Sequence, residues 1–208
     1  MIRTGLLGGS FNPAHRAHRA ITLAAIARLG LDEAWWLVSP GNPLKPAAGM
    51  APLVARAASA RAAARRAPIK VTAIERELGT RYTIDTLRAL QRRYPRRRFV
   101  WIMGADNLAQ LHRWKDWRQI ARTMPMIVFA RPGYAAKAFA SPAMAWLRRY
   151  RVAPEALLDG AGRLPRIAWL SFDPDAASAT AVRLADPDWA ARYARSRPRD
   201  GVTGRIIG

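Results

Sequence analysis

The interpretation of this 208-residue chain starts from the stretch TGLLGGSFNPAHRAH, residues 4–18. Its apolar beginning ends in Gly8 and Gly9, which is typical of a buried strand that enters a tight turn. Glycines after a strand let backbone amides approach an anion closely, and the start of a following helix favours phosphate. We therefore expect a phosphate-binding turn, with Asn12 as a helix cap and Pro13 at the first helical position.

Two histidines, His15 and His18, follow this turn. Their spacing places both rings on one face of a helix. Imidazoles above a phosphate turn can donate hydrogen bonds to oxygens whose charge grows during a transfer reaction. The alternatives are two surface histidines or a metal site, although the chain has only one further histidine and no cysteine.

Outward from this stretch, short apolar runs alternate with segments of helical spacing. Strands are expected at 4–9, 34–38, 69–73, 99–103, 126–130 and 167–170. Helices are expected at 16–29, 53–66, 82–94, 108–122, 138–150 and 178–184. Near-continuous apolar strands between helices predict an α/β fold, a Rossmann-like doubly wound parallel sheet with helices on both faces. The length suits one domain, residues 1–208, with residues 184–208 as a helical or irregular appendage.

Ligands of such sheets bind beyond the carboxyl ends of the strands, so residues that follow strands are the candidates for a site. Asp106 comes just after one predicted strand, where a carboxylate can bond a ribose hydroxyl. Ser178 and Thr180 follow the last strand and can cap a helix or bind phosphate, with Arg183 close behind. An ordinary cap with a solvated arginine is the alternative.

Aromatic and hydroxyl side chains form a further group of candidates. Trp114 and Trp117 offer flat faces for a heteroaromatic ring, although core packing is the alternative. Residues 82–87 begin with Tyr82 and Thr83 at a predicted helix start, where backbone amides are free.

The charge is strongly positive, with 35 Lys and Arg against 14 Asp and Glu and a net charge of +21. This balance suggests a nucleic-acid-binding protein as an alternative. However, only four of the basic residues are lysines, and the longest purely basic run is residues 96–98. Scattered arginines on predicted helices, such as 56–66 and 88–93, are better interpreted as solvated faces. The missing cysteines exclude a thiolate zinc site and a cysteine nucleophile.

No secretory signal and no apolar run of roughly 18 residues is present in the sequence, so we expect a cytoplasmic protein without a membrane partner. No clustered basic segment is present either, so we expect no nucleic-acid partner. The sequence leaves the oligomeric state open.

Taken together, the segments resemble those of the bacterial nicotinate-nucleotide adenylyltransferases of the nucleotidylyltransferase superfamily. The run from Gly8 to Pro13 with His15 and His18 resembles the first signature of this family, and residues 178–183 resemble the second. Residues 82–87, 104–107 and 114–117 fall between them in the expected order. The resemblance covers most of the chain, from about residue 5 to 183.

The resemblance implies an enzyme of NAD biosynthesis that transfers AMP from ATP to nicotinate mononucleotide, giving nicotinate adenine dinucleotide and pyrophosphate. It implies the catalytic residues His15, His18 and Arg183. It implies the ATP-binding residues Gly8, Gly9, Ser10, Phe11, His15, His18, Gly104, Asp106, Ser178, Thr180 and Arg183. It implies the nicotinate mononucleotide-binding residues Asn12, Lys45, Tyr82, Thr83, Trp114 and Arg131.

Mg²⁺ is expected to arrive with ATP, held by phosphates and water, so no metal-binding residues are predicted. Position 17 is Ala where the family signature usually has Gly, and we expect its methyl group to press on the adenine. The alternatives on the same chemistry are nicotinamide mononucleotide, phosphopantetheine or a cytidylyltransferase substrate as acceptor. A family member that binds nucleotide without turnover is a further alternative.

Overall fold

The computed structural model describes residues 1–41, 48–130, 135–159, 163–171 and 178–208. The strands are β1 (Ile2–Gly9), β2 (Glu33–Val38), β3 (Ile69–Thr72), β4 (Arg97–Gly104), β5 (Met126–Ala130) and β6 (Ile167–Ser171). The helices are α1 (Arg16–Leu29), α2 (Leu53–Ala63), α3 (Ile74–Leu78), α4 (Thr83–Arg93), α5 (Ala105–Gln110), α6 (Trp117–Thr123), α7 (Ala135–Phe139), α8 (Pro142–Leu147) and α9 (Ala179–Ala185). Short 3-10 turns are η1 (Leu111–Arg113), η2 (Arg148–Tyr150) and η3 (Ala191–Tyr193).

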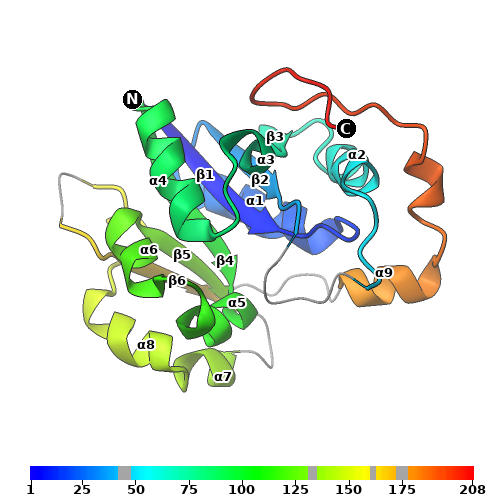
Figure 1. Ribbon diagram of the computed structural model, residues 1–208. Coiled ribbons are helices and arrows are strands. Elements are labelled where there is room, and N and C mark those ends of the chain that lie inside the picture. Colours follow the sequence, from blue (N-terminus) through cyan, green and yellow to red (C-terminus); the bar gives the residue numbers. More distant parts are fainter. Residues whose placement is uncertain (42–47, 131–134, 160–162, 172–177) are drawn as a thin grey trace.

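The strands form one parallel sheet in the order β3-β2-β1-β4-β5-β6 (Figure 1). The chain first builds outward from β1 to β3 and then returns to add β4 on the other side of β1. This arrangement is the doubly wound order of a Rossmann-like fold, and it confirms the predicted fold class. The reversal between β1 and β4 places the expected ligand crevice beyond Gly9 and Gly104.

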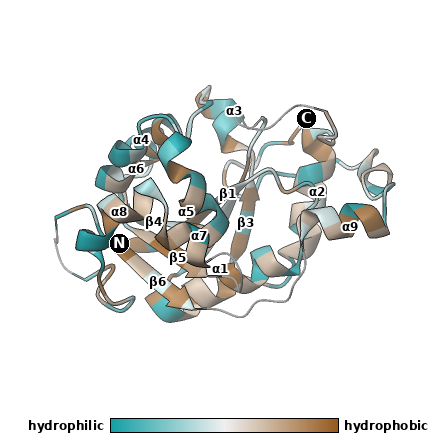
Figure 2. Ribbon diagram, turned by 90° about the horizontal axis from the view of Figure 1, so that it is seen from below, coloured by the Kyte–Doolittle hydropathy of each residue, from teal (hydrophilic) through white to brown (hydrophobic). Residues whose placement is uncertain are grey.

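Alternate strand residues separate two apolar cores, one on each face of the sheet. Leu6 and Trp35 pack on one face with α4, α5, α6 and α8. Leu7 and Trp36 pack on the other face with α1 and α2. Figure 2 shows hydrophobic colours on β3, β5 and β6, whereas the outer helix α4 carries mostly hydrophilic colours. The sheet is therefore covered on both sides, as the apolar strands predict.

Helix α1 spans the predicted residues 16–29 and ends at Gly30, which adopts a left-handed conformation with φ 57°. The helix begins at Arg16 as predicted, but its N-cap is His15 and not Asn12. The prediction that Asn12 caps this helix and that Pro13 starts it is therefore wrong. Asn12 instead donates its side-chain amide to the Gly49 carbonyl at 2.9 Å.

Two of the long helices expected from the sequence are broken into shorter pieces. Residues 138–150 divide into the end of α7, α8 and η2, because Pro142 starts α8 and the Ser141 hydroxyl accepts a hydrogen bond from the Met144 amide at 3.1 Å. Residues 108–122 divide into α5, η1 and α6, with Asp116 at φ 49° before α6. The prediction of a single helix over 138–150 is wrong at this break, and residues 108–122 are helical in separate pieces.

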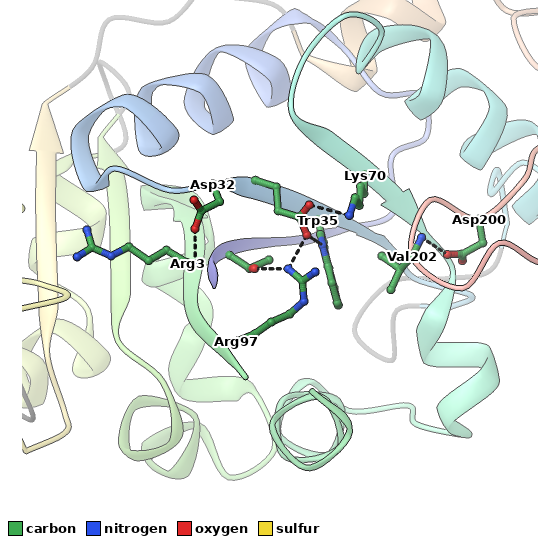
Figure 3. Close-up of polar contacts among 9 residues, drawn as sticks. Arg3, Asp32, Trp35, Lys70, Arg97, Asp200 and Val202 are labelled. Carbon is green, nitrogen blue, oxygen red and sulfur yellow. Dashed lines mark hydrogen bonds and ion pairs between the residues drawn. The ribbon is translucent and has the colours of Figure 1, made fainter. Parts of the chain in front are cut away.

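The amino ends of the central strands are joined by a charged network around Glu33 (Figure 3). Glu33 accepts hydrogen bonds from Trp35 Nε1 at 2.7 Å and Arg97 Nη1 at 2.5 Å, and it pairs with Lys70 at 2.7 Å. Burial works to raise the pKa of Glu33, yet these partners hold the pKa below its ordinary value. Because the network lies at the strand starts, it stabilises the end of the sheet opposite the crevice.

Several arginines act as cross-links rather than as a solvated face. Arg56 is 1% exposed and donates to the carbonyls of Ala51, Ser10 and Ser39 at 2.7–2.8 Å. Burial lowers the pKa of its guanidinium. The prediction that all of residues 56–66 form a solvated face is therefore wrong at Arg56, which ties together the loops that follow β1 and β2. Among the helices of the described residues, none combines the length and apolar character needed to cross a membrane.

Candidate active site

A cleft of about 390 Å³ lies beyond the carboxyl ends of β1 and β4, at the reversal of the strand order. Gly8 and Gly9 from β1 line one part of it, and Gly104 at the end of β4 lines another. The start of α9 and the start of α4 reach the same cleft, although they are about a hundred residues apart in the sequence. The position agrees with the rule that ligands of doubly wound sheets bind at the switch point.

The glycine turn is closely packed from behind. A Cβ atom on Gly8 would lie 2.5 Å from Cη2 of Trp101, a residue that is 3% exposed and itself lines the cleft. The backbone of β1 therefore approaches the indole more closely than any side chain at position 8 allows. The contact with Trp101 therefore requires glycine at position 8.

Replacing Gly8 by alanine is expected to destabilise the protein by about 1–3 kcal/mol, because the added methyl group forces the buried indole to move. Gly41→Ala is the matched control, since a Cβ at Gly41 meets no atom of the described residues within 4 Å. Denaturant unfolding of both variants measures the difference. Equal stability of the two variants would contradict the close packing of Gly8.

The two histidines meet at the start of α1, with ring centroids 3.8 Å apart. The His15 amide donates to Nδ1 of His18 at 3.2 Å. Because Nδ1 of His18 accepts this bond, the proton of the neutral ring lies on Nε2. Both histidines line the cleft, and the His18 ring packs against Phe11 at 4.8 Å. The His15 amide therefore fixes the orientation of the His18 ring.

The second candidate segment lies against the first. Arg183 donates to the main-chain carbonyl of Asn12 at 2.6 Å and to the Thr180 hydroxyl at 3.2 Å. The Ser178 hydroxyl caps α9 by accepting the Ala181 amide at 3.1 Å, and Ser178 lines the cleft. Thr180 and Arg183 lie just outside the cleft wall, so the described position of Arg183 holds the glycine turn against α9.

The opposite wall, which we call the acceptor side, consists of Tyr82, Thr83 and Trp114. Tyr82 is the N-cap of α4, and no side chain caps this helix start. Its first amides are therefore available to an anion, at the positive end of the helix dipole. Lys115 adds a charge here, with Nζ 4.6 Å from the Tyr82 ring centroid and 3.2 Å from Asp85 Oδ2.

The structure brings most of the predicted residues together. The predicted residues that line the cleft are Gly8, Gly9, Ser10, Phe11, Asn12, His15, His18, Tyr82, Thr83, Gly104, Asp106, Trp114 and Ser178. Lys45 and Arg131 lie outside the described residues. Ala17 is fully buried and is not part of the cleft wall, so the expectation that its methyl group presses on adenine is wrong.

Sequence reasoning missed several polar residues of the cleft, namely Ser39, Glu75, Arg81, Asn107, Gln110, Arg113 and Lys115. Ser39 follows β2 directly, so the rule that found Asp106 would also have found Ser39. Arg81 and Lys115 each adjoin a predicted residue. Glu75 lies on α3, a five-residue helix that the sequence pattern does not predict.

Glu75 is the one carboxyl that the described part of the cleft holds on its acceptor side near α4. The Thr86 hydroxyl donates to Glu75 Oε1 at 3.3 Å and lies 2.8 Å from the Thr80 hydroxyl. Burial raises the pKa of Glu75 to about 7, while hydrogen bonds with Thr86 and Ser39 act to lower it. Glu75 therefore carries its proton over much of the acid range in the folded protein.

Replacing Glu75 by glutamine is expected to stabilise the protein increasingly as the pH rises. The unfolded carboxyl ionises near pH 4.5 and the folded one near 7, so wild-type stability falls between these values, whereas the glutamine side chain of the variant cannot ionise. The gain of the variant over wild type should grow by up to about 3 kcal/mol between pH 4.5 and 8. Denaturant unfolding at several pH values measures it.

Glu155→Gln is the matched control, because Glu155 is exposed and distant from the cleft wall. Its stability should follow that of wild type at every pH. Parallel curves for Glu75→Gln and wild type would show that Glu75 ionises normally in the folded protein.

A metal cage of protein side chains is not found in the part of the chain that the structure describes, where no three His, Cys, Asp or Glu side chains gather. Asp106 and the protonated Glu75 are the carboxyls on the described cleft wall. This sparse donor set fits a divalent ion that is bound mainly by phosphate and water.

Comparison with known proteins places these observations in a family context. A family profile described as cytidylyltransferase-like matches residues 6–185. The chain is 65% identical over 207 residues to a probable nicotinate-nucleotide adenylyltransferase of Erythrobacter litoralis, covering 99% of this chain and 94% of the relative. It is 51% identical over 193 residues to a protein of the same name from a Bradyrhizobium species, covering 90% of this chain and 98% of the relative.

Among solved structures, the chain is similar to the nicotinic acid mononucleotide adenylyltransferase of Plasmodium falciparum complexed with NaAD, with a TM-score of 0.66. The similarity covers 88% of this chain and 83% of that one, at 14% sequence identity. At this identity the likeness bears on the fold alone.

Proposed function

The chain belongs to the cytidylyltransferase-like family and groups with its nicotinate-nucleotide adenylyltransferases, and from this membership we propose how its cleft works. The protein is a nucleotidyltransferase that transfers AMP from ATP to nicotinate mononucleotide. The products are nicotinate adenine dinucleotide and pyrophosphate, in NAD biosynthesis. The observation that carries this function is the meeting of the glycine turn, His18 and the uncapped start of α4 in one cleft.

The nucleophile is an oxygen of the acceptor phosphate. A phosphate monoester has its second pKa near roughly 6, so this group is largely dianionic at neutral pH and requires no general base. The oxygen attacks the α-phosphorus of ATP and forms the new phosphorus–oxygen bond. The bond from the α-phosphorus to the bridging oxygen breaks, and pyrophosphate leaves with the electron pair. The protein therefore has to position two anions and stabilise the growing charge.

The ATP side of the cleft is assigned to the glycine turn, Ser10, the histidines and Ser178. Gly8 and Gly9 admit the triphosphate, because their backbone faces the cleft without side chains. His18 donates from Nε2 to the α-phosphate as its charge grows, and its orientation is fixed by the His15 amide. Phe11, Gly104 and Asp106 are assigned to the nucleoside.

Arg183 and Thr180 complete this side through α9. Arg183 is bound to the Asn12 carbonyl, so it holds the turn that carries the phosphate. Arg183 therefore acts on the bound phosphates indirectly. His15 and His18 are assigned as the groups that lie closer to them. Mg²⁺ would supply charge neutralisation on the phosphates when it is bound, and the phosphates themselves and water would hold it.

The acceptor side of the cleft fits a pyridine carboxylate. A carboxylate only accepts hydrogen bonds, so it suits the amides at the start of α4, whereas a carboxamide would also require an acceptor. Trp114 supplies a flat face for the pyridine ring, and Lys115 and Arg81 add positive charge to this wall. These groups favour nicotinate over nicotinamide mononucleotide. A cytoplasmic location and the absence of a nucleic-acid partner stay predictions.

Steady-state release of pyrophosphate tests this function with a panel of acceptors. Purified protein and Mg-ATP are combined in turn with nicotinate mononucleotide, nicotinamide mononucleotide and phosphopantetheine, and with CTP in place of ATP. The highest kcat/KM is expected for ATP with nicotinate mononucleotide. Turnover with phosphopantetheine alone, or release with none of the acceptors, would reject the proposed function.

A further inference from the structure

Asp200 is a buried carboxylate that does not line the cleft, and it is only 4% exposed. Its Oδ2 accepts hydrogen bonds from the Thr72 hydroxyl and the Ala73 amide, both at 2.8 Å. Its Oδ1 accepts the amide of Val202 at 2.9 Å (Figure 3) and the amide of Thr203 at 3.0 Å. One carboxylate therefore shapes a turn near the end of the sequence and fastens it to the end of β3.

Further contacts extend this attachment over residues 199–208, which we call the C-terminal segment. Gly201 donates its amide to the Val71 carbonyl at 2.8 Å, in a contact so close that a Cβ would lie 3.1 Å from that oxygen. Ile207 is buried against Ala57 and Ala73. Figure 1 shows this segment, in red, running beside β3 and α2. The segment is thus packed as part of the fold.

The C-terminal segment also contacts helix α3 through Glu77. The Thr203 hydroxyl donates to Glu77 Oε1 at 2.7 Å, and Arg205 lies 3.6 Å from Glu77 Oε2. At the start of α3, the Thr72 hydroxyl that donates to Asp200 also accepts the Ile74 amide at 3.0 Å. The segment therefore holds α3 both at its first residue and near its end.

Helix α3 in turn supports the acceptor side of the cleft. Glu75 lines the cleft and receives the Thr86 hydroxyl of α4 at 3.3 Å. The Thr86 hydroxyl lies 2.8 Å from the Thr80 hydroxyl, and this contact joins α4 to the short connection that follows α3. The same connection ends at Tyr82 and Thr83, whose amides face the proposed carboxylate. A shift of α3 would therefore move the groups that receive the pyridine.

We propose that Asp200 and Thr203 are positioning residues for the acceptor side of the cleft, acting through α3 on the start of α4. This inference rests on the proposed function, because it assigns the acceptor to that wall. None of residues 199–208 lines the cleft, so the C-terminal segment acts without touching the substrate. The glycine turn on the ATP side is held from α9 by Arg183 and should be less affected.

Two variants of graded severity test the proposal, together with a matched control. Asp200→Asn turns an acceptor oxygen into a donor that faces other donors, and Thr203→Val removes only the bond to Glu77. Asp188→Asn makes the same charge change at an exposed position of the preceding segment. Each is compared with wild type well below its unfolding temperature, by KM for both substrates and by hydrogen exchange of residues 74–86.

The KM for nicotinate mononucleotide is expected to rise about tenfold in Asp200→Asn and about threefold in Thr203→Val, because a displaced wall binds the acceptor poorly. The KM for ATP should stay within about twofold of wild type, because ATP is assigned to the other wall of the cleft. Amides of residues 74–86 should exchange faster in both variants. Asp188→Asn should match wild type in all three measurements.

A folded Thr203→Val protein with a lower unfolding temperature but an unchanged acceptor KM would overturn the proposal, and so would a parallel rise of both KM values. If Asp200→Asn does not fold, Thr203→Val decides alone. Should wild type fail to use nicotinate mononucleotide, the proposed function falls, and unchanged exchange at residues 74–86 would separately reject the link through α3.

Discussion

Replacing His18 by alanine is expected to lower kcat by about a hundredfold to a thousandfold, the usual loss when one fixed donor to a developing anion is removed. In the structure, the His15 amide donates to Nδ1 of His18, so the proton of the neutral ring lies on Nε2, and His18 lines the cleft. The bond to the α-phosphate strengthens as the charge grows, and the loss should therefore appear in kcat more than in the KM for ATP.

His18→Gln is the matched variant for this test. The glutamine amide nitrogen can reach the place of Nε2, whereas alanine leaves it empty. His18→Gln should therefore retain more turnover than His18→Ala. Since the His18 ring also packs against Phe11, thermal unfolding of both variants shows whether the fold is kept. Near-normal turnover of a folded His18→Ala protein would remove His18 from the mechanism.

Replacing Trp114 by alanine is expected to raise the KM for nicotinate mononucleotide by about tenfold to a hundredfold. Stacking of a heteroaromatic ring on an aromatic side chain is worth about 1–3 kcal/mol, and the alanine variant loses that face. Trp114 lines the acceptor side, so the KM for ATP should change little. Steady-state kinetics with each substrate varied in turn measures both values.

Trp114→Phe separates stacking from support of the fold, because phenylalanine keeps a flat face of smaller area. This variant should lie between wild type and alanine in acceptor KM. Trp114 also packs against the core on the α4 face of the sheet, so a general collapse would raise both KM values together. An unchanged acceptor KM in the alanine variant would place the pyridine ring elsewhere.

Much of the fold was predictable because its signals are local. Apolar runs mark the six strands, and Gly30 marks the end of α1 in a left-handed turn. The order of the six strands within the sheet depends on long-range pairing and was not predicted. The broken helices were missed because Pro142 and Asp116 stand inside helical spacing, and the spacing outweighed these breaks in the prediction.

Site residues that directly follow a strand were predictable from the sequence. Residues whose position depends on contacts with distant parts of the sequence were not. Gly9 and Asp106 stand directly after β1 and β4, so the position rule finds them. Glu75 rests on a five-residue helix with one fully buried side chain, Ile74, which leaves no periodic pattern. Asp200 meets Ala73 across 127 positions of sequence, and nothing near Asp200 in the sequence points to β3.

The net charge of +21 is explained in part by the fold itself. Arg56 and Arg183 donate to main-chain carbonyls around the glycine turn. Arg97 belongs to the network at the opposite end of the sheet. In the cleft, Arg81, Arg113 and Lys115 face a site proposed for two anionic substrates. These positive groups can also steer ATP toward the cleft.

The most direct test of the central claim is the identity of the dinucleotide formed in competition. Purified protein is given Mg-ATP with equal concentrations of nicotinate and nicotinamide mononucleotide, and the products are identified by mass spectrometry. The account predicts nicotinate adenine dinucleotide as the main product, together with an equal amount of pyrophosphate. Formation of the nicotinamide dinucleotide alone, or consumption of ATP without any dinucleotide, would contradict it.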